Sequence, residues 1–256
     1  VTLCLLCLSA CQTTKEEPVI DPEEQGIAER VRHYQREIAK TPEDAELHYR
    51  LGNALLDMGR NQDAYQVYQK AIQFKSDYAD AYANLGLVLR KMGNLKAAIG
   101  AYAQALDINP EDKTTINNLA VVAELTEDWE RVRWCYGKLY ALEPANMEYA
   151  GAYAAVLYGL GDYEGAVPVY EKLVAAKQET ATNAYRLGFC HYSLNQWDHA
   201  IEIWEAARQL APDDPPINRG LVAAYVSLGD TVSARTAAER CRALGIPLEP
   251  ALQEEL

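Results

Sequence analysis

The chain has 256 residues, a formal net charge of −13 and a hydrophobic content of 49%. This hydrophobic content is ample for a packed core and excludes a generally disordered chain. The excess of acidic side chains repels phosphate backbones, so we do not expect a nucleic-acid partner.

The first ten residues, VTLCLLCLSA, form an uncharged apolar run that is too short to span a bilayer. The sequence LSAC at residues 8 to 11 resembles a bacterial lipobox at the end of a secretory signal peptide. This resemblance implies cleavage before Cys11 and acylation of that cysteine, which would attach the chain to a membrane. The chain departs from the pattern because no basic residue precedes Lys15. A buried N-terminal strand or helix is the alternative interpretation.

A polar, acidic linker is predicted to follow the lipid anchor, over residues 11 to 24, and it contains two prolines. Gln12, directly after the cysteine, resembles an outer-membrane sorting signal. Residues 25 to 44 include an amphipathic helix whose apolar residues share one face. They are Ile27, Val31, Tyr34 and Ile38. We expect this partial unit to cap the repeats that follow.

From residue 45 onward the sequence repeats every 34 residues without insertion or deletion. Residues 79 to 112 show the pattern best, with two amphipathic helices around a turn at Gly93 and Pro110 after the second helix. One position carries mainly leucine, another a small residue and a third an aromatic residue. Their members are Leu51, Leu85, Leu119, Tyr153, Leu187 and Leu221; Ala64, Ala98, Val132, Ala166, Ala200 and Ala234; and Tyr68, Tyr102, Tyr136, Tyr170, Trp204 and Ala238.

This pattern resembles the tetratricopeptide repeat (TPR) over residues 45 to 248. The resemblance implies an all-α fold, a TPR solenoid of six helix-turn-helix repeats with an N-terminal capping helix. The predicted repeats are 45–78, 79–112, 113–146, 147–180, 181–214 and 215–248, followed by a C-terminal tail, 249–256. The sequence departs from the family at Ala120 and Glu127, where glycine is usual, and at Val222 and Ala238 in the last repeat.

No catalytic or metal-binding motif is apparent. Cys135, Cys190 and Cys241 occupy repeat positions that are aliphatic elsewhere, so we expect buried thiols rather than disulfides. Cys190 and His191 are neighbours in a helix and point about 100° apart, which does not suit a nucleophile and its base. No metal spacing, Walker loop, Rossmann fingerprint or nucleophile elbow occurs. We therefore predict no catalytic residue, metal, cofactor or small-molecule substrate, and no enzymatic activity.

The remaining candidate is a peptide-binding groove, because the TPR resemblance implies that the first helices of the repeats line a concave face. Its predicted polar half consists of Arg50, Asn53, Asn84 and Asn118. Its predicted apolar half consists of Tyr158, Tyr185, Phe189 and Tyr192. The family's carboxylate clamp is not expected, since Tyr49, Thr114 and Asn118 stand where the clamp has basic residues. Aromatic side chains that only fill gaps between helices, and solvated asparagines, are the alternative.

Taken together, these features resemble the TPR assembly lipoproteins of bacterial outer membranes, of the Tad-pilus or pilotin-like kind. The resemblance implies a non-enzymatic protein–protein interaction scaffold that faces the periplasm of a Gram-negative bacterium. Its partners would be a protein or peptide and, through the lipid anchor, the membrane. Such a scaffold would help to assemble a pilus, a secretin or another envelope complex. A soluble cytoplasmic TPR adaptor with no anchor, and an adaptor for cell-wall enzymes, stay open as alternatives.

Overall fold

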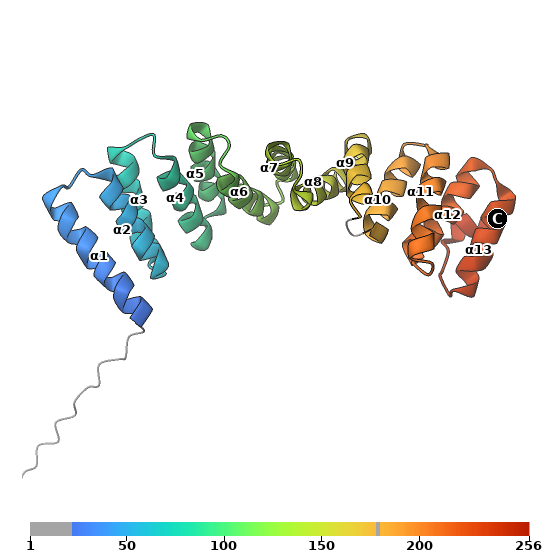
Figure 1. Ribbon diagram of the computed structural model, residues 1–256, viewed down its shortest axis with the longest axis horizontal. Helices are drawn as coiled ribbons and strands as arrows, with labels where there is room; N and C mark the ends of the chain where they lie inside the picture. Colours follow the sequence, from blue (N-terminus) through green and yellow to red (C-terminus); the bar gives the residue numbers. More distant parts are fainter. Residues whose placement is uncertain (1–21, 178–179, 256) are drawn as a thin grey trace, which may run out of the picture. The chain divides into compact units, whose positions relative to one another are not determined.

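The computed structural model describes residues 22–177 and 180–255, and all regular secondary structure in these residues is α-helical (Figure 1). The chain divides into two compact units, and within each unit helices that follow one another in the sequence pack together. The predicted all-α TPR solenoid with a capping helix before its first repeat is therefore confirmed. The predicted signal peptide, Cys11 and most of the linker lie outside the described residues.

The first unit ends at Asp77 and, in its described part, contains three helices. They are α1 (Pro22–Lys40), α2 (Ala45–Asp57) and α3 (Asn61–Phe74). α1 begins at Pro22, before the predicted start at residue 25, because proline needs no hydrogen-bond partner for its nitrogen in the first turn. α1 packs against α2. Val31 on α1 is buried, and Arg30 forms an ion pair with Asp57, with 3.1 Å between Nη2 and Oδ2.

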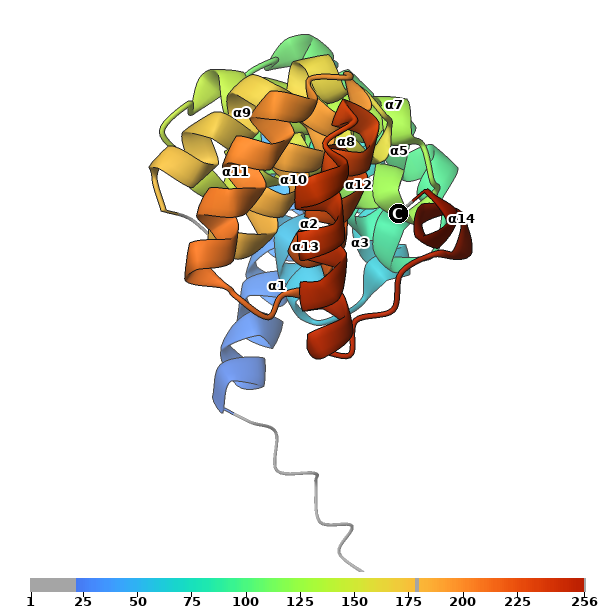
Figure 2. The same ribbon diagram turned by 90° about the vertical axis from the view of Figure 1, so that its right-hand side faces the viewer.

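The second unit, Tyr78–Leu256, contains the remaining helices (Figures 1 and 2). They are α4 (Ala79–Lys91), α5 (Leu95–Ile108), α6 (Lys113–Leu125), α7 (Trp129–Leu142), α8 (Met147–Gly159), α9 (Tyr163–Ala175), α10 (Thr180–Ser193), α11 (Trp197–Leu210), α12 (Pro215–Leu228), α13 (Thr231–Ala243) and α14 (Pro250–Glu254). α14 forms within the predicted tail, where no helix was expected. Among residues 22–177 and 180–255, no helix combines the length and the apolar character needed to cross a bilayer.

A residue with a left-handed backbone ends the first helix of each repeat. Glycine takes this conformation at four of these turns, where it carries no steric cost. The four are Gly59, Gly93, Gly161 and Gly229. Glu127 and Asn195 adopt the same conformation in repeats three and five, with φ of 55° and 58°. The turn is thus kept where glycine is absent, at a cost of about 1–2 kcal/mol for a residue such as Glu127.

Glycine also makes room for the large aromatic side chain of the second helix in three repeats. A Cβ atom added at Gly52, Gly86 or Gly188 would lie 2.5, 2.7 and 2.3 Å from the nearest atom of the aromatic side chain facing it. These aromatic residues are Tyr68, Tyr102 and Trp204. In the last repeat the larger residue is on the first helix and the smaller one on the second: Val222 stands at the glycine position and Ala238 at the aromatic position. Both are buried. The larger side chain of Val222 and the smaller side chain of Ala238 therefore compensate each other in volume.

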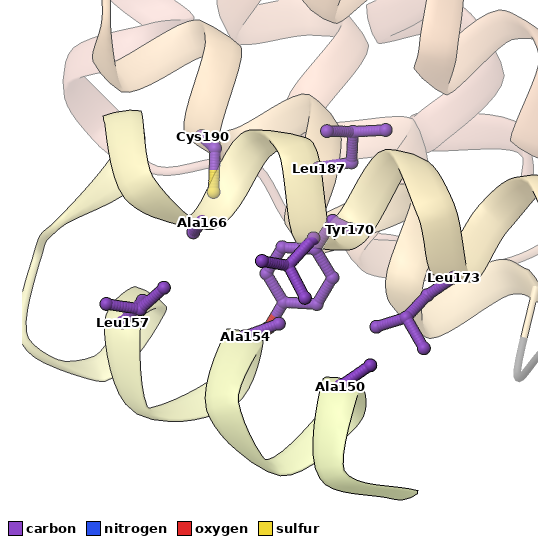
Figure 3. Close-up of a cluster of buried hydrophobic side chains, with 9 residues drawn as sticks. Ala150, Ala154, Leu157, Ala166, Tyr170, Leu173, Leu187 and Cys190 are labelled. Atoms are coloured by element: carbon purple, nitrogen blue, oxygen red, sulfur yellow. The ribbon is translucent and has the colours of Figure 1, made fainter. Parts of the chain in front are cut away.

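Repeat four shows how the core is packed (Figure 3). Tyr170 of α9 is completely buried and lies beside Ala154 of α8, and Leu173 and Leu187 border the same cluster. Cys190 from α10 completes this core. Cys135, Cys190 and Cys241 are buried free thiols, which confirms their predicted place in the core.

Candidate functional site

The four predicted aromatic residues of the apolar half lie together in the second unit. Phe189 is in ring contact with all three others, at centroid distances of 5.5 Å to Tyr158, 6.3 Å to Tyr185 and 6.5 Å to Tyr192. Tyr163, which the sequence argument did not include, joins them at 5.8 Å from Phe189. All five side chains are half-buried, so part of each ring is accessible to a ligand.

The spacing of residues along α10 creates this cluster. Tyr185, Phe189 and Tyr192 follow one another at intervals of four and three residues, which places them on one face of the helix. Trp204 of α11 lies beneath them, with ring centroids 6.1 Å from both Tyr185 and Tyr192. Its indole Nε1–H donates to the backbone carbonyl of Tyr185 at 3.0 Å. The buried tryptophan therefore fixes the base of the cluster.

A cavity of about 380 Å³ extends from this cluster to α12 and the C-terminal tail, and we call it the aromatic groove. One side is formed by Tyr185, Phe189, Tyr192 and Trp204 of repeat five. The other side is formed by Pro216, Arg219, Gly220, Ala223, Val226 and Ser227 of α12. Four tail residues complete the lining, namely Glu249, Ala251, Leu252 and Glu255.

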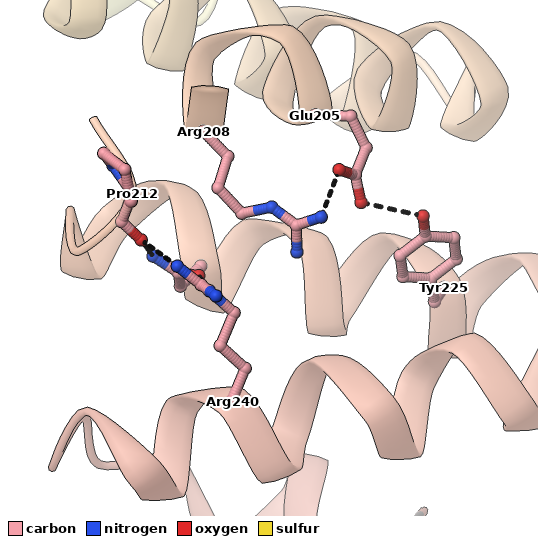
Figure 4. A network of polar contacts seen from close by, with 6 residues as sticks. Glu205, Arg208, Pro212, Tyr225 and Arg240 are labelled. Atoms are coloured by element: carbon pink, nitrogen blue, oxygen red, sulfur yellow. Dashed lines mark hydrogen bonds and ion pairs between the residues drawn. The ribbon is translucent and has the colours of Figure 1, made fainter. Parts of the chain in front are cut away.

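Polar contacts hold α12 against its neighbours and so fix one wall of the groove (Figure 4). The Tyr225 hydroxyl donates to Glu205 Oε1 on α11 at 3.0 Å, and Arg208 pairs with the same carboxylate. On the other side of α12, Arg240 of α13 donates to Asn218 Oδ1 at 3.2 Å. Asp214 caps the start of α12, since its Oδ1 accepts from the backbone N–H of Ile217 at 3.0 Å. The wall is therefore pre-organised.

The groove contains one cation, Arg219, which is half-buried. Within the part of the chain that the structure describes, its guanidinium has no hydrogen bond or ion pair shown. Burial raises the pKa of the Tyr185 phenol, and the nearby charge of Arg219 opposes this rise. Burial also raises the pKa of Tyr158 to about 12. Tyr158 and Tyr185 are therefore neutral hydrogen-bonding groups at ordinary pH, and Tyr185 lies near the positive charge of Arg219.

The residues of the predicted polar half are divided between the two units. In the first unit, Arg50 Nε donates to Glu46 Oε1 at 2.6 Å, and Asn53 Oδ1 accepts from the Tyr68 hydroxyl at 2.6 Å. Asn84 lies on α4 and Asn118 on α6 of the second unit. Three of the predicted aromatic residues, Tyr185, Phe189 and Tyr192, thus line one cavity, and Tyr158 touches Phe189 outside that lining. Binding by the polar residues stays a prediction.

Two glycines lie in α8, Gly151 and Gly159, and glycine costs about 1 kcal/mol of helix propensity relative to alanine. A Cβ at either position would meet no atom within 4 Å, so no neighbouring residue requires glycine there. Packing therefore does not explain them.

Sequence reasoning also missed parts of the groove. Trp204 was read only as a repeat position, although its stacking on Tyr185 makes it the floor. Arg219 carries no motif, and its importance appears only when α12 is placed opposite α10. The tail helix did leave a signal, because Glu249-Pro250 puts proline at the first helical position, where it is favoured.

Metal ligands and thiols are two kinds of reactive side chain. Within residues 22–177 and 180–255, no group of three or more His, Cys, Asp or Glu side chains could hold a metal ion. Burial raises the pKa of Cys135 to about 12 and that of Cys190 to about 11, so both thiols are protonated and poorly nucleophilic at neutral pH.

Comparisons with family models match three segments of the chain. A model described as TPR repeat matches residues 52–93, and one described as tetratricopeptide repeat matches residues 79–112. A model of anaphase-promoting complex, cyclosome, subunit 3 matches residues 160–241. No curated protein sequence matches the chain.

Several solved structures share the fold. YrrB, described as a TPR protein with an unusual peptide-binding site, has 18% identity and a TM-score of 0.56, covering 74% of this chain and 98% of YrrB. A chain of the Naa15/Naa10 complex bound to HypK-THB has 16% identity and a TM-score of 0.73, covering 91% of this chain and 37% of that one. A tetratricopeptide repeat protein from Parabacteroides merdae has 12% identity and a TM-score of 0.51, covering 91% and 92%.

Proposed function

We propose that the chain is a non-enzymatic tetratricopeptide-repeat scaffold that binds a protein or peptide partner in the aromatic groove. One observation carries the proposal: half-buried aromatic side chains gather around a cavity of about 380 Å³. Clusters of this kind are common at interaction sites, because aromatic side chains provide large contact areas at low cost in conformational entropy.

The groove combines the two kinds of contact that a peptide needs. The rings of Tyr185, Phe189 and Tyr192 offer apolar area, and their tyrosine hydroxyls can exchange hydrogen bonds with a peptide backbone. Arg219 can receive a carboxylate in two parallel hydrogen bonds. YrrB, which has a similar fold, is described as having a peptide-binding site, and this supports the same class of ligand here.

The groove is tested by comparing partner capture with thermal stability in Phe189→Ala and Tyr185→Ala. If the rings bind a partner, each truncation weakens binding by roughly thirtyfold, which corresponds to about 2 kcal/mol. Trp134→Ala is the matched control, since this tryptophan is 50% exposed on α7 and does not line the groove. Normal capture by the folded Phe189→Ala and Tyr185→Ala proteins would refute the groove as the binding site.

We further propose that the scaffold is anchored through an acylated Cys11 on the periplasmic side of a Gram-negative outer membrane. The support is the LSAC sequence at residues 8 to 11, with Gln12 and a polar linker after it. Each buried methylene of an acyl chain contributes about 0.8 kcal/mol, and a single chain gives only reversible binding, so stable anchoring requires several chains. Assembly of a pilus, a secretin or another envelope complex is the role we propose for such an anchored scaffold.

Cell fractionation of Cys11→Ser tests the anchor. We expect the wild-type protein in the membrane fraction and the variant in the soluble fraction, while Cys7→Ser, four residues earlier, leaves the distribution unchanged. A variant that stays in the membrane would disprove lipid anchoring at Cys11. Wild-type protein found in the soluble fraction would instead favour a soluble TPR adaptor or an adaptor for cell-wall enzymes, neither of which needs the anchor.

A further inference from the structure

The C-terminal helix α14 is labelled near the chain's end in Figure 2. Its residues Ala251 and Leu252 line part of the aromatic groove. It packs on α12, and its Leu252 contacts the core cluster of the last repeat together with Leu248. Tyr225 and Val226 of α12 border the same cluster. The tail therefore lies along the wall of the groove with one leucine directed into apolar surroundings.

α14 is attached to α12 and the last repeat by few contacts. Leu252 is half-buried, whereas the other α14 residues are exposed. The hydrogen bonds shown for α14 are internal to the tail: Gln253 donates from its backbone nitrogen to the Glu249 carbonyl at 3.1 Å and from its side chain to the Leu248 carbonyl at 2.8 Å. A helix of five residues is not stable by itself, so α14 persists only while Leu252 is docked.

The charges of the groove and the tail are complementary. Glu249 and Glu255 line the same cavity as Arg219. No ion pair is shown between these groups in the described residues, so the two carboxylates share the cavity with the cation without being fixed to it. A segment with a leucine and flanking carboxylates therefore matches both the apolar and the charged parts of this site.

Resting on the function proposed above, we propose that α14 is a displaceable cover on one side of the aromatic groove, which a partner peptide can replace. The partner is then a peptide of the same class, a short helical segment that presents one leucine-like side chain beside carboxylates. The tail competes with this partner, because both require the place of Leu252 on the core cluster of the last repeat, at the cavity that Arg219 also lines. The apparent affinity for the partner is consequently reduced, because only the molecules in which the tail is undocked can bind it.

The test uses a fluorescently labelled peptide with the sequence of residues 247–255, PLEPALQEE, and the full chain. Leu252→Gln releases the tail without adding charge. We expect this variant to bind the peptide about fivefold more tightly than the wild type, as estimated from the loss of one half-buried leucine contact. Val232→Gln is the matched control, because Val232 is 76% exposed on α13 and lines no part of the groove, and it should bind like the wild type.

Two further binding measurements test the contacts that Arg219 and the peptide's second leucine are expected to make. Adding Arg219→Gln to Leu252→Gln should remove most of the gain, and a peptide with glutamine in place of its second leucine should not bind. Leu252→Ala, a smaller change, should shift the affinity in the same direction and serves if Leu252→Gln folds poorly. Equal affinity of the wild type and both Leu252 variants for the peptide, or no binding to any of them, would overturn the proposal.

These outcomes are separable from failure of the function itself. If Phe189→Ala abolishes partner capture but the Leu252 variants leave peptide affinity unchanged, the groove binds a partner and the tail is no competitor. If partner capture is independent of Phe189 while the Leu252 variants bind the peptide more tightly, the tail docks as proposed and the partner binds elsewhere.

Discussion

Gly188→Ala tests whether the floor of the groove is as tightly fixed as the geometry indicates. A Cβ at position 188 would lie 2.3 Å from Trp204 Nε1, well inside van der Waals contact. The indole cannot simply move away, since a Cβ at Gly220 would lie only 2.9 Å from its opposite edge. Its Nε1–H is also bonded to the Tyr185 carbonyl at 3.0 Å.

The free-energy change has three parts. Overpacking costs about 1–3 kcal/mol, and loss of the indole hydrogen bond costs about 1 kcal/mol. Replacing glycine by alanine inside a helix returns about 1 kcal/mol. The net destabilisation is therefore about 1–3 kcal/mol, and the second unit should melt about 4–8 °C lower for a loss near 2 kcal/mol.

Gly151→Ala is the matched control, because it makes the same change inside α8 with no atom within 4 Å of the new Cβ. Only the helix-propensity gain applies, so the free energy of unfolding should rise by about 0.5–1 kcal/mol. Melting of both variants is followed by circular dichroism at 222 nm, a helix signal chosen because of the all-α fold. If both substitutions raised the melting temperature, Trp204 would not be confined between α10 and α12, and the pre-organised floor would have to be abandoned.

Three other predictions follow from the fold. Ala98→Trp should lower the melting temperature because Ala98 is completely buried, whereas Glu111→Gln in an exposed turn should not; equal melts would contradict the repeat register. Cys135 and Cys190 should resist alkylation at pH 8 until the protein is unfolded, since burial raises their pKa values to about 12 and about 11; rapid labelling of the native protein, detected by mass spectrometry, would show that they are accessible. Burial raises the pKa of Tyr158 to about 12. The stabilising contribution of its neutral phenol is therefore complete below about pH 10 and is lost as the pH rises through 12. The melting temperature of Tyr158→Phe should consequently fall less steeply with pH than that of the wild type over this range.

The repeat architecture could be predicted from sequence because its signals are local and recur. The small residue at Ala98 and the aromatic residue at Tyr102 have equivalents every 34 residues, and these positions are buried except for Tyr136, which is half-buried. Even turns without glycine keep the left-handed conformation, as Glu127 shows. Periodicity averages over many positions, so a departure at one of them does not obscure the pattern.

The groove was less predictable because its parts come from different repeats. The aromatic residues of α10 could be recognised from helical spacing alone, but their partners on α11 and α12 depend on how successive helices pack. Arg219 has no sequence motif, and its significance depends on lying opposite Tyr185 without an ion pair shown in the described residues. A glycine in a helix does not by itself indicate close packing, because a Cβ at Gly151 would meet no atom within 4 Å.

Leu252 of α14 packs on the repeat that α12 and α13 form, so this short helix covers apolar surface of that repeat. Here Val222 and Ala238 keep the core of that repeat filled, while Leu252 reaches it from a separate short helix. Because α14 is held by the half-buried Leu252, a partner segment with the same chemistry can replace it on this surface. Docking of α14 and binding of a partner therefore compete for the same surface.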